Sequence, residues 1–272
     1  MSSFGRSNNT DVRQQQQGPR YNVRYKTSNP MLSERRFAEA SAGASMTDTS
    51  ERMTINGTAN KVGFLLLCCV TSALFVWTRV SDGGGMGLAI GGAIGGFIVA
   101  LITTFKPEWS AVTAPIYAVL EGLFIGGVSA VMESRFPGIA LQAAGLTFGV
   151  FFSLLFAYKT RLIRVTETFR SGIIVAMMGL MLVYLVSFFV RMFTGFPLAF
   201  IHEGGIFGII FSLVVVAIAA ANLLLDFDFI EATAEEGAPK YMEWFGAFGL
   251  MVTLVWLYIE ILRLLAKLRD ND

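Results

Sequence analysis

The residues with the clearest chemical potential are acidic side chains inside apolar sequence. The stretch "NLLLDFDFIE" places Asp226, Asp228 and Glu231 directly after a long apolar run, and "LVWLYIEILRLL" and "YAVLEGLFIGGVSA" contain Glu260 and Glu121. A carboxylate in hydrocarbon costs a few kcal/mol or more unless it is paired, protonated or faces water. Such residues therefore indicate proton binding, cation binding or a buried ion pair.

Asp226 is the strongest of these candidates because Asn222 lies one turn earlier on the same helical face. Asp228 points elsewhere, about 200° round the helix. Asp228 and Glu231 also lie near the end of the apolar run, where a helix that reaches water carries charge without any further role. Asn222 and Asp226 are thus predicted to form one polar stripe, and Asp228 is a secondary candidate.

Glu260 and Glu121 each have a structural explanation. Arg263 stands at i+3 from Glu260 and can neutralise it, while Glu121 can be a protonated hydrogen-bond donor between helices. If Asp226 and Glu260 instead lie close together in a low dielectric, they can share one proton and titrate as a coupled unit. At higher pH both ionise, repel and attract a hard cation such as Ca²⁺, which binds oxygen ligands. The pair is predicted to sense pH and to line an ion pathway, without a tightly bound metal or another cofactor.

The composition indicates an all-α, polytopic membrane protein. Of the 272 residues, 54% are hydrophobic and 15% are charged, whereas about a quarter of the residues of a soluble domain are charged. Residues 1–58 are polar and include "QQQQ", which predicts a disordered cytoplasmic tail. Residues 59–268 are predicted to form a domain of seven transmembrane helices, at about 62–77, 85–105, 111–132, 139–158, 171–193, 205–229 and 244–265.

Composition also bears on partners and topology. The net charge of +1 gives no indication of nucleic acid binding, and the single histidine, His202, cannot build an imidazole metal site by itself. The adjacent Cys68 and Cys69 do not favour a mutual disulfide. With the N-terminus inside, 15 of the 21 Lys and Arg residues fall on inner segments. The positive-inside rule therefore predicts a cytoplasmic N-terminus in the plasma (inner) membrane.

The second predicted helix, "GMGLAIGGAIGGFIVAL", repeats glycine on one helical face at Gly87, Gly91 and Gly95, with Gly92 and Gly96 beside them. Small residues let helix backbones approach closely, which improves van der Waals contact inside a lipid bilayer. This stripe is predicted to pack tightly within the bundle, with a self-dimerisation face or a flexible gate as the alternatives.

Several of these segments together resemble the Bax inhibitor-1 family, the transmembrane Bax inhibitor motif proteins, in its bacterial form. The resemblance rests on "TINGTANK", "APIYAVLEGLFIGGVSAVME", "LLLDFDFIE" followed by "EEG", and "EWFGAFGLMVTLVWLYIEILRLL". It implies a bundle in which six helices surround a central seventh, and a calcium leak gated by pH through two facing acids. Matched motif by motif, those acids fall on Asp226 and Glu260, with glutamate in place of a second aspartate.

The helix geometry sets a condition on that acid pair. A straight seventh helix from Tyr241 places Glu260 about 28 Å further along its axis, away from Asp226. Contact requires that residues 241–249, which include Glu243, bend or lie at the membrane interface. If the two acids do not meet, Glu121 or Glu243 is the next partner to consider.

Two other functions compete with an ion leak. An intramembrane aspartyl protease would carry a "GxGD" motif, which "LLLDFDF" lacks, and no serine has a histidine on a neighbouring helical position. We therefore expect no enzymatic activity. The stronger alternative is a non-transporting regulator that binds a membrane protease or another membrane protein in a stress response, because a disordered tail can be captured by partners.

Overall fold

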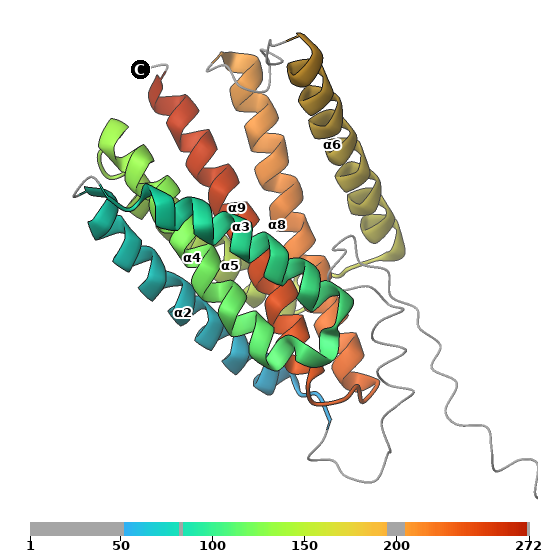
Figure 1. Cartoon of the computed structure of the whole chain (residues 1–272). Helices are drawn as coiled ribbons and strands as arrows, with labels where there is room; N and C mark the ends of the chain where they lie inside the picture. The colour runs from blue at the N-terminus through green and yellow to red at the C-terminus, as the bar shows by residue number, and fades with distance from the viewer. Residues whose placement is uncertain (1–51, 82–83, 195–204, 271–272) are drawn as a thin grey trace, which may run out of the picture.

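The computed structural model describes residues 52–81, 84–194 and 205–270, and within them it contains seven long α-helices and one short 3₁₀ helix (Figure 1). Most of the predicted tail and His202 lie outside these residues. The elements are α2 (Ile55–Ser81), α3 (Met86–Phe105), η4 (Pro107–Trp109), α4 (Ser110–Arg135), α5 (Ile139–Lys159), α6 (Glu167–Thr194), α8 (Ile206–Glu235) and α9 (Met242–Asp270).

Each long helix is apolar and long enough to cross a bilayer, so the predicted seven-helix membrane bundle is confirmed. Several helices extend beyond the predicted spans. Helix α2 begins at Ile55 instead of residue 62, and α8 continues to Glu235 instead of residue 229. The extensions carry polar residues that contact neighbouring helices, so these helices continue beyond their apolar runs.

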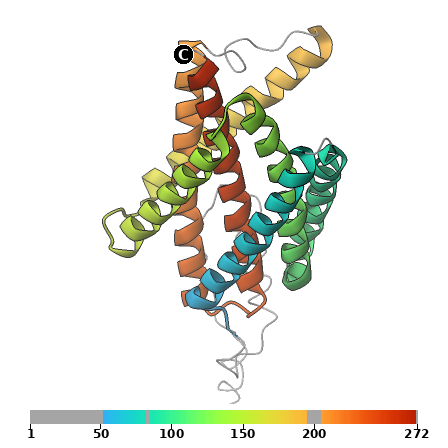
Figure 2. The ribbon, with the colours of Figure 1, turned by 90° about the vertical axis from the view of Figure 1, so that its left-hand side faces the viewer.

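Helix α9 is the centre of the bundle, as predicted (Figures 1 and 2). It packs against α2, α4, α5 and α8, and in Figure 2 it lies between α8 and the group formed by α2, α3 and α4. In its most apolar stretch 78% of the residues are buried, against 11% in α6. Lipid therefore faces most of α6, whereas α9 is surrounded by protein.

Helices α2, α3 and α4 form a closely packed unit that depends on glycine. A Cβ on Gly126 or Gly122 of α4 would run into backbone atoms of α2 at Ala73 and Cys69. On α3, a Cβ on Gly92 would come within 2.5 Å of the Leu120 carbonyl oxygen. These positions exclude any larger residue without a shift of the backbone.

The predicted glycine stripe of α3 is therefore displaced by one helical position. Gly87 and Gly91 would meet no atom within 4 Å if a Cβ were added, and Gly95 faces only the end of the Leu120 side chain. The contact face is instead formed by Gly92 and Gly96, which lie next to the predicted residues in the sequence. Sequence periodicity places glycines on helical faces, but it does not say which face meets the neighbouring helix.

A tight turn joins α8 to α9. Gly237 has a positive φ of 77°, its N–H bonds to the Ala234 carbonyl, and the Ala238 N–H bonds to the Thr233 carbonyl. This is a Schellman ending, which favours glycine at its left-handed position. The Met53 N–H donates to the Ala238 carbonyl at 2.6 Å, and Arg52 forms an isolated antiparallel bridge with Pro239. The segment before α2 is thereby attached to the turn.

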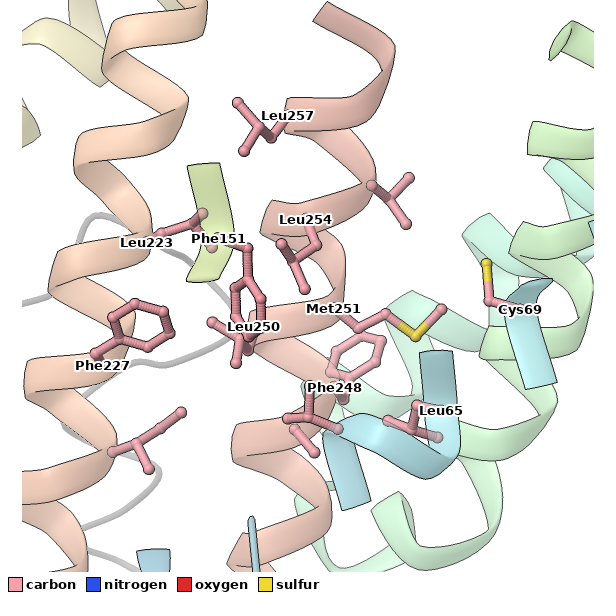
Figure 3. Packing of buried hydrophobic residues seen from close by; sticks show 14 of the residues in the cluster. Leu65, Cys69, Phe151, Leu223, Phe227, Phe248, Leu250, Met251, Leu254 and Leu257 are labelled. Carbon is pink, nitrogen blue, oxygen red and sulfur yellow. The ribbon is translucent and has the colours of Figure 1, made fainter. Parts of the chain in front are cut away.

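Apolar side chains fill the space between α8, α9 and α5. Figure 3 shows Phe151 of α5 among Leu223 and Phe227 of α8 and Leu250 of α9. The Phe151 and Phe227 rings are 5.8 Å apart at their centroids. This apolar packing fixes the distance and register of α8 and α9, and with them the polar residues between the two helices.

Candidate functional site

Asn222 and Asp226 lie on the face of α8 that meets α9. Their exposed fractions are 2% and 0%, and the Asn222 amide nitrogen is 3.5 Å from Asp226 Oδ2. The i, i+4 spacing therefore produces the polar stripe that the sequence predicts. The stripe is buried inside the protein and does not face lipid.

The principal contact of this stripe on α9 is Thr253, a residue that the sequence did not single out. Its hydroxyl group donates to Asp226 Oδ2 at 2.6 Å and lies 3.4 Å from the Asn222 amide nitrogen and from the Gly249 carbonyl oxygen. Thr253 is itself 2% exposed. Carboxylate, amide and hydroxyl groups from the two helices thus form one buried polar cluster, called here the Asp226 cluster.

The structure does not bring Glu260 to Asp226. Helix α9 is continuous from Met242 to Asp270, so residues 242–249 belong to the same helix as Glu260. Asp226 lies nine residues before the end of α8 and Thr253 lies eleven residues after the start of α9. In an antiparallel helix pair with a short turn, such positions face each other. Glu260 is two turns beyond Thr253, about 10 Å further along the axis.

Glu260 instead has its own partners on α9 and α6. Arg263 Nη1 is 2.8 Å from Glu260 Oε1 and 3.0 Å from Oε2, so the local neutralisation suggested by the i+3 spacing is present. The Tyr184 hydroxyl of α6 donates to Glu260 Oε1 at 3.3 Å. Glu260 is 3% exposed, and its charge is matched by Arg263 and not shared with Asp226.

Asp228 and Glu231 lie on a different face of α8 and form ion pairs with the α5–α6 region. Arg170 Nη2 is 2.5 Å from Asp228 Oδ2, and Arg161 Nη2 is 2.8 Å from Glu231 Oε1. The Tyr158 hydroxyl contacts both carboxylates. The sequence interpretation of these two acids as a simple water boundary missed these cations, because α5 and α6 are distant in sequence.

Glu243 is completely buried, at 0% exposed, and completes the N-terminus of α2. Its Oε1 accepts from the Thr54 backbone N–H at 2.9 Å and from the Thr54 hydroxyl at 2.8 Å, and Lys61 and Lys240 form ion pairs with it. In a capping box the carboxylate comes from the third residue of the same helix. Here that residue is Gly57, and the carboxylate comes from α9.

Glu121 lies at the centre of the α2–α3–α4 unit. The Tyr117 side chain, one turn earlier on α4, lies near its carboxyl group, and a Cβ on Gly96 of α3 would lie 3.2 Å from Glu121 Oε2. Glu121 and Glu243 were the alternative partners for Asp226. The structure places the Glu121 carboxyl against α3 and the Glu243 carboxyl at the N-terminus of α2.

The described residues contain no group of three or more His, Cys, Asp and Glu side chains placed to hold a metal ion. The Asp226 cluster offers oxygen atoms from one carboxylate, one amide and one hydroxyl group. A hard cation such as Ca²⁺ takes six to eight oxygens as a rule. These three side chains therefore fit transient contact with a partly hydrated cation, and not a high-affinity site.

The chain matches a family model described as "Bax inhibitor 1 like" over residues 6–270. Comparison with curated proteins and with solved structures gives no match. The family match covers nearly the whole chain and includes every residue of the clusters described above.

Proposed function

The chain belongs to the Bax inhibitor 1 like family, and we propose that it is a pH-sensitive calcium leak whose ion pathway passes Asp226. The observation that carries this proposal is the Asp226 cluster: a fully buried carboxyl group held by oxygen- and nitrogen-bearing side chains of α8 and the central helix α9. A buried acid at the most enclosed helix pair is a functional candidate in a membrane protein.

The chemistry of the cluster supports a single-acid mechanism. At low pH Asp226 is neutral, and its contacts with Thr253 and Asn222 close the α8–α9 seam. At higher pH the ionised carboxylate attracts water and a hard cation, and the neighbouring oxygens replace part of the cation's hydration shell. Thr253 cannot ionise, so opening does not depend on repulsion between two acids.

Calcium flux into proteoliposomes at acidic and alkaline pH tests this proposal. The informative comparison is wild type with Asp226→Asn, which keeps the size of the side chain but cannot ionise. We expect Asp226→Asn to lose the alkaline increase in flux. Glu260→Gln is the matched control, and it should retain the pH dependence because Glu260 lies two turns away with Arg263. Unchanged flux in Asp226→Asn would contradict the proposal.

The proposed setting is the plasma (inner) membrane with a cytoplasmic N-terminus. It is supported by the excess of Lys and Arg on the segments that this orientation places inside. Cysteine substitutions at residue 137, between α4 and α5, and at residue 164, between α5 and α6, should then react with a membrane-impermeant thiol reagent from opposite sides. Labelling of both from one side would contradict the orientation.

A second candidate function is a non-transporting regulator that binds a membrane protease or another membrane protein under stress. It is supported by the attachment of Met53 and Thr54 to the α8–α9 turn, since residues 1–51 lead directly into this attachment. Deletion of residues 1–50 should abolish partner binding and leave calcium flux intact. Binding that survives the deletion would place the interaction on the bundle instead.

A further inference from the structure

Glu121 is half-buried on α4, and none of the ion pairs described above includes it. Helix α3, which covers it, contains no titratable residue along its length. The nearest titratable groups are Tyr117, one turn earlier on α4, and Cys69 on α2, which are 4% and 6% exposed. Both groups are neutral at physiological pH.

The described residues provide no ion pair to Glu121. On α2, Lys61 pairs with Glu243, and Arg79, ten residues from Cys69, lies over the Phe75 ring. On α9, the Tyr258 hydroxyl bonds to Ser129 and Arg263 pairs with Glu260. On α5, the Tyr158 hydroxyl contacts Asp228 and Glu231. Among the described residues, α2, α3, α5 and α9 thus form no ion pair with the Glu121 carboxyl group.

Close packing of two helices on α4 limits the water that can reach the half-buried Glu121 carboxyl group. Gly92 and Gly96 bring α3 onto Leu120 and Glu121, and Gly122 and Gly126 bring α2 onto the other side of α4. An ionised carboxylate in such a place is unfavourable. A protonated carboxyl group avoids this cost and can still hydrogen bond with Tyr117.

We propose that Glu121 is a proton-binding site of the membrane domain, separate from the Asp226 cluster, which holds its proton at neutral pH. The ligand is a proton, and the site is built by the Tyr117 hydroxyl and the close approach of α3 at Gly96. Release of the proton requires that α3 and α4 separate enough to admit water. The site therefore links the packing of the α2–α3–α4 unit to alkaline pH and does not depend on calcium conduction.

Infrared difference spectroscopy of the full-length protein in lipid tests this proposal, because a protonated carboxyl group has a C=O stretch that is separate from the carboxylate bands. We expect wild type at neutral pH to show a carboxylic acid band that disappears in Glu121→Gln. The band should persist in Asp226→Asn, which shows that it does not come from the Asp226 cluster. The same band at full intensity in Glu121→Gln would overturn the proposal.

A pair of glycine variants on α3 tests the geometry of the site. Gly96→Ala adds a Cβ 3.2 Å from Glu121 Oε2, whereas Gly91→Ala meets no atom within 4 Å. The acid band should shift in frequency in Gly96→Ala and remain in place in Gly91→Ala. Equal spectra for the two variants would contradict the placement of the protonated group against α3. Neither measurement involves calcium flux, so the outcome is independent of the proposed leak.

Discussion

The two faces of α8 carry similar acids but give them different partners. On the face toward α9, Asp226 contacts the Thr253 hydroxyl and the Asn222 amide. On the face toward α5 and α6, two residues later, Asp228 pairs with Arg170. Both acids are aspartates of one apolar helix. Local sequence places them on different faces, but it does not say which groups each face meets.

The neighbouring helix decides whether a carboxyl group inside the bundle forms an ion pair or contacts neutral groups. An acid that meets Arg or Lys is ionised and joins two helices, as Asp228 does, and as Glu243 does with Lys61 and Lys240. A hydroxyl or amide group can keep its contact with an acid in either protonation state of that acid. Asp226 and Glu121 have such neutral partners among their contacts, and they are the residues for which we propose ion or proton chemistry.

The largest effect on stability is expected for Glu243→Gln. Glu243 is fully buried, forms ion pairs with Lys61 and Lys240, and accepts hydrogen bonds at the N-terminus of α2. Removing one partner of a buried ion pair costs about 3 to 5 kcal/mol. We expect a strongly lowered thermal unfolding midpoint in detergent. Glu235→Gln, at an exposed position of the same turn region, is the control and should leave the midpoint unchanged. Equal midpoints for the two variants would show that the ion pairs of Glu243 do not stabilise the fold.

The next largest effect is expected for Arg170→Met. The Arg170 side chain is 5% exposed and that of Asp228 is 19% exposed, so the cost is smaller than for a fully buried pair, about 2 kcal/mol. The double variant with Asp228→Asn should recover part of the loss, because it removes the unpaired carboxylate. Additive effects in this thermodynamic cycle would show that the two residues do not interact.

Gly57→Ala tests the close contact between the N-terminus of α2 and the Glu243 carboxylate of α9. Its Cβ would run into the Glu243 carboxyl group, and such overpacking costs about 1 to 3 kcal/mol. Gly63→Ala on the same helix meets no atom within 4 Å and should not lower the unfolding midpoint. A stable Gly57→Ala would indicate that Glu243 can leave the cap without consequence.

Thr253→Val removes the hydroxyl group that contacts Asp226 but keeps the shape of the side chain. The loss of one buried hydrogen bond should lower stability by about 1 kcal/mol. It should also shift the pH dependence of calcium flux to higher pH, because the ionised form of Asp226 loses a hydrogen-bond donor. Thr253→Ser restores the hydroxyl group and should restore both properties. If flux is indifferent to all three side chains, Thr253 has only a packing role.

The smallest effect is expected for Glu121→Gln, the same chemical change as Glu243→Gln at a half-buried glutamate. If Glu121 carries a proton, the neutral amide replaces a neutral acid, and stability should change by less than about 1 kcal/mol. The comparison of the two unfolding midpoints therefore reports directly on charge. If Glu121→Gln lowers the unfolding midpoint as much as Glu243→Gln does, Glu121 is ionised as well.

Much of the fold could be predicted from the sequence. The apolar runs predict seven membrane helices, and the i, i+4 spacing of Asn222 and Asp226 predicts a shared face. Arg263 at i+3 from Glu260 predicts a local ion pair, which the structure contains. These features depend on residues within one helix, for which the helical repeat fixes the geometry.

The candidate site could be predicted only in part, because its other half is on α9. The motif comparison chose Glu260, the acid in α9 nearest to the family pattern, whereas the register of the α8–α9 pair places Thr253 opposite Asp226. That register depends on the Gly237 turn and on the extension of α8 to Glu235. Counting residues back from the turn along α8 and forward along α9 places Thr253 opposite Asp226, but this count requires the ends of both helices.

Hydropathy and helical periodicity are local properties of the chain, so the membrane class, the helices and the positions of the acids along them follow from the sequence. Which acid meets a cation and which meets a hydroxyl group depends on how the helices pack. An acid's protonation and ion contacts depend on groups within a few ångströms. In this bundle those groups come from helices that are distant in sequence.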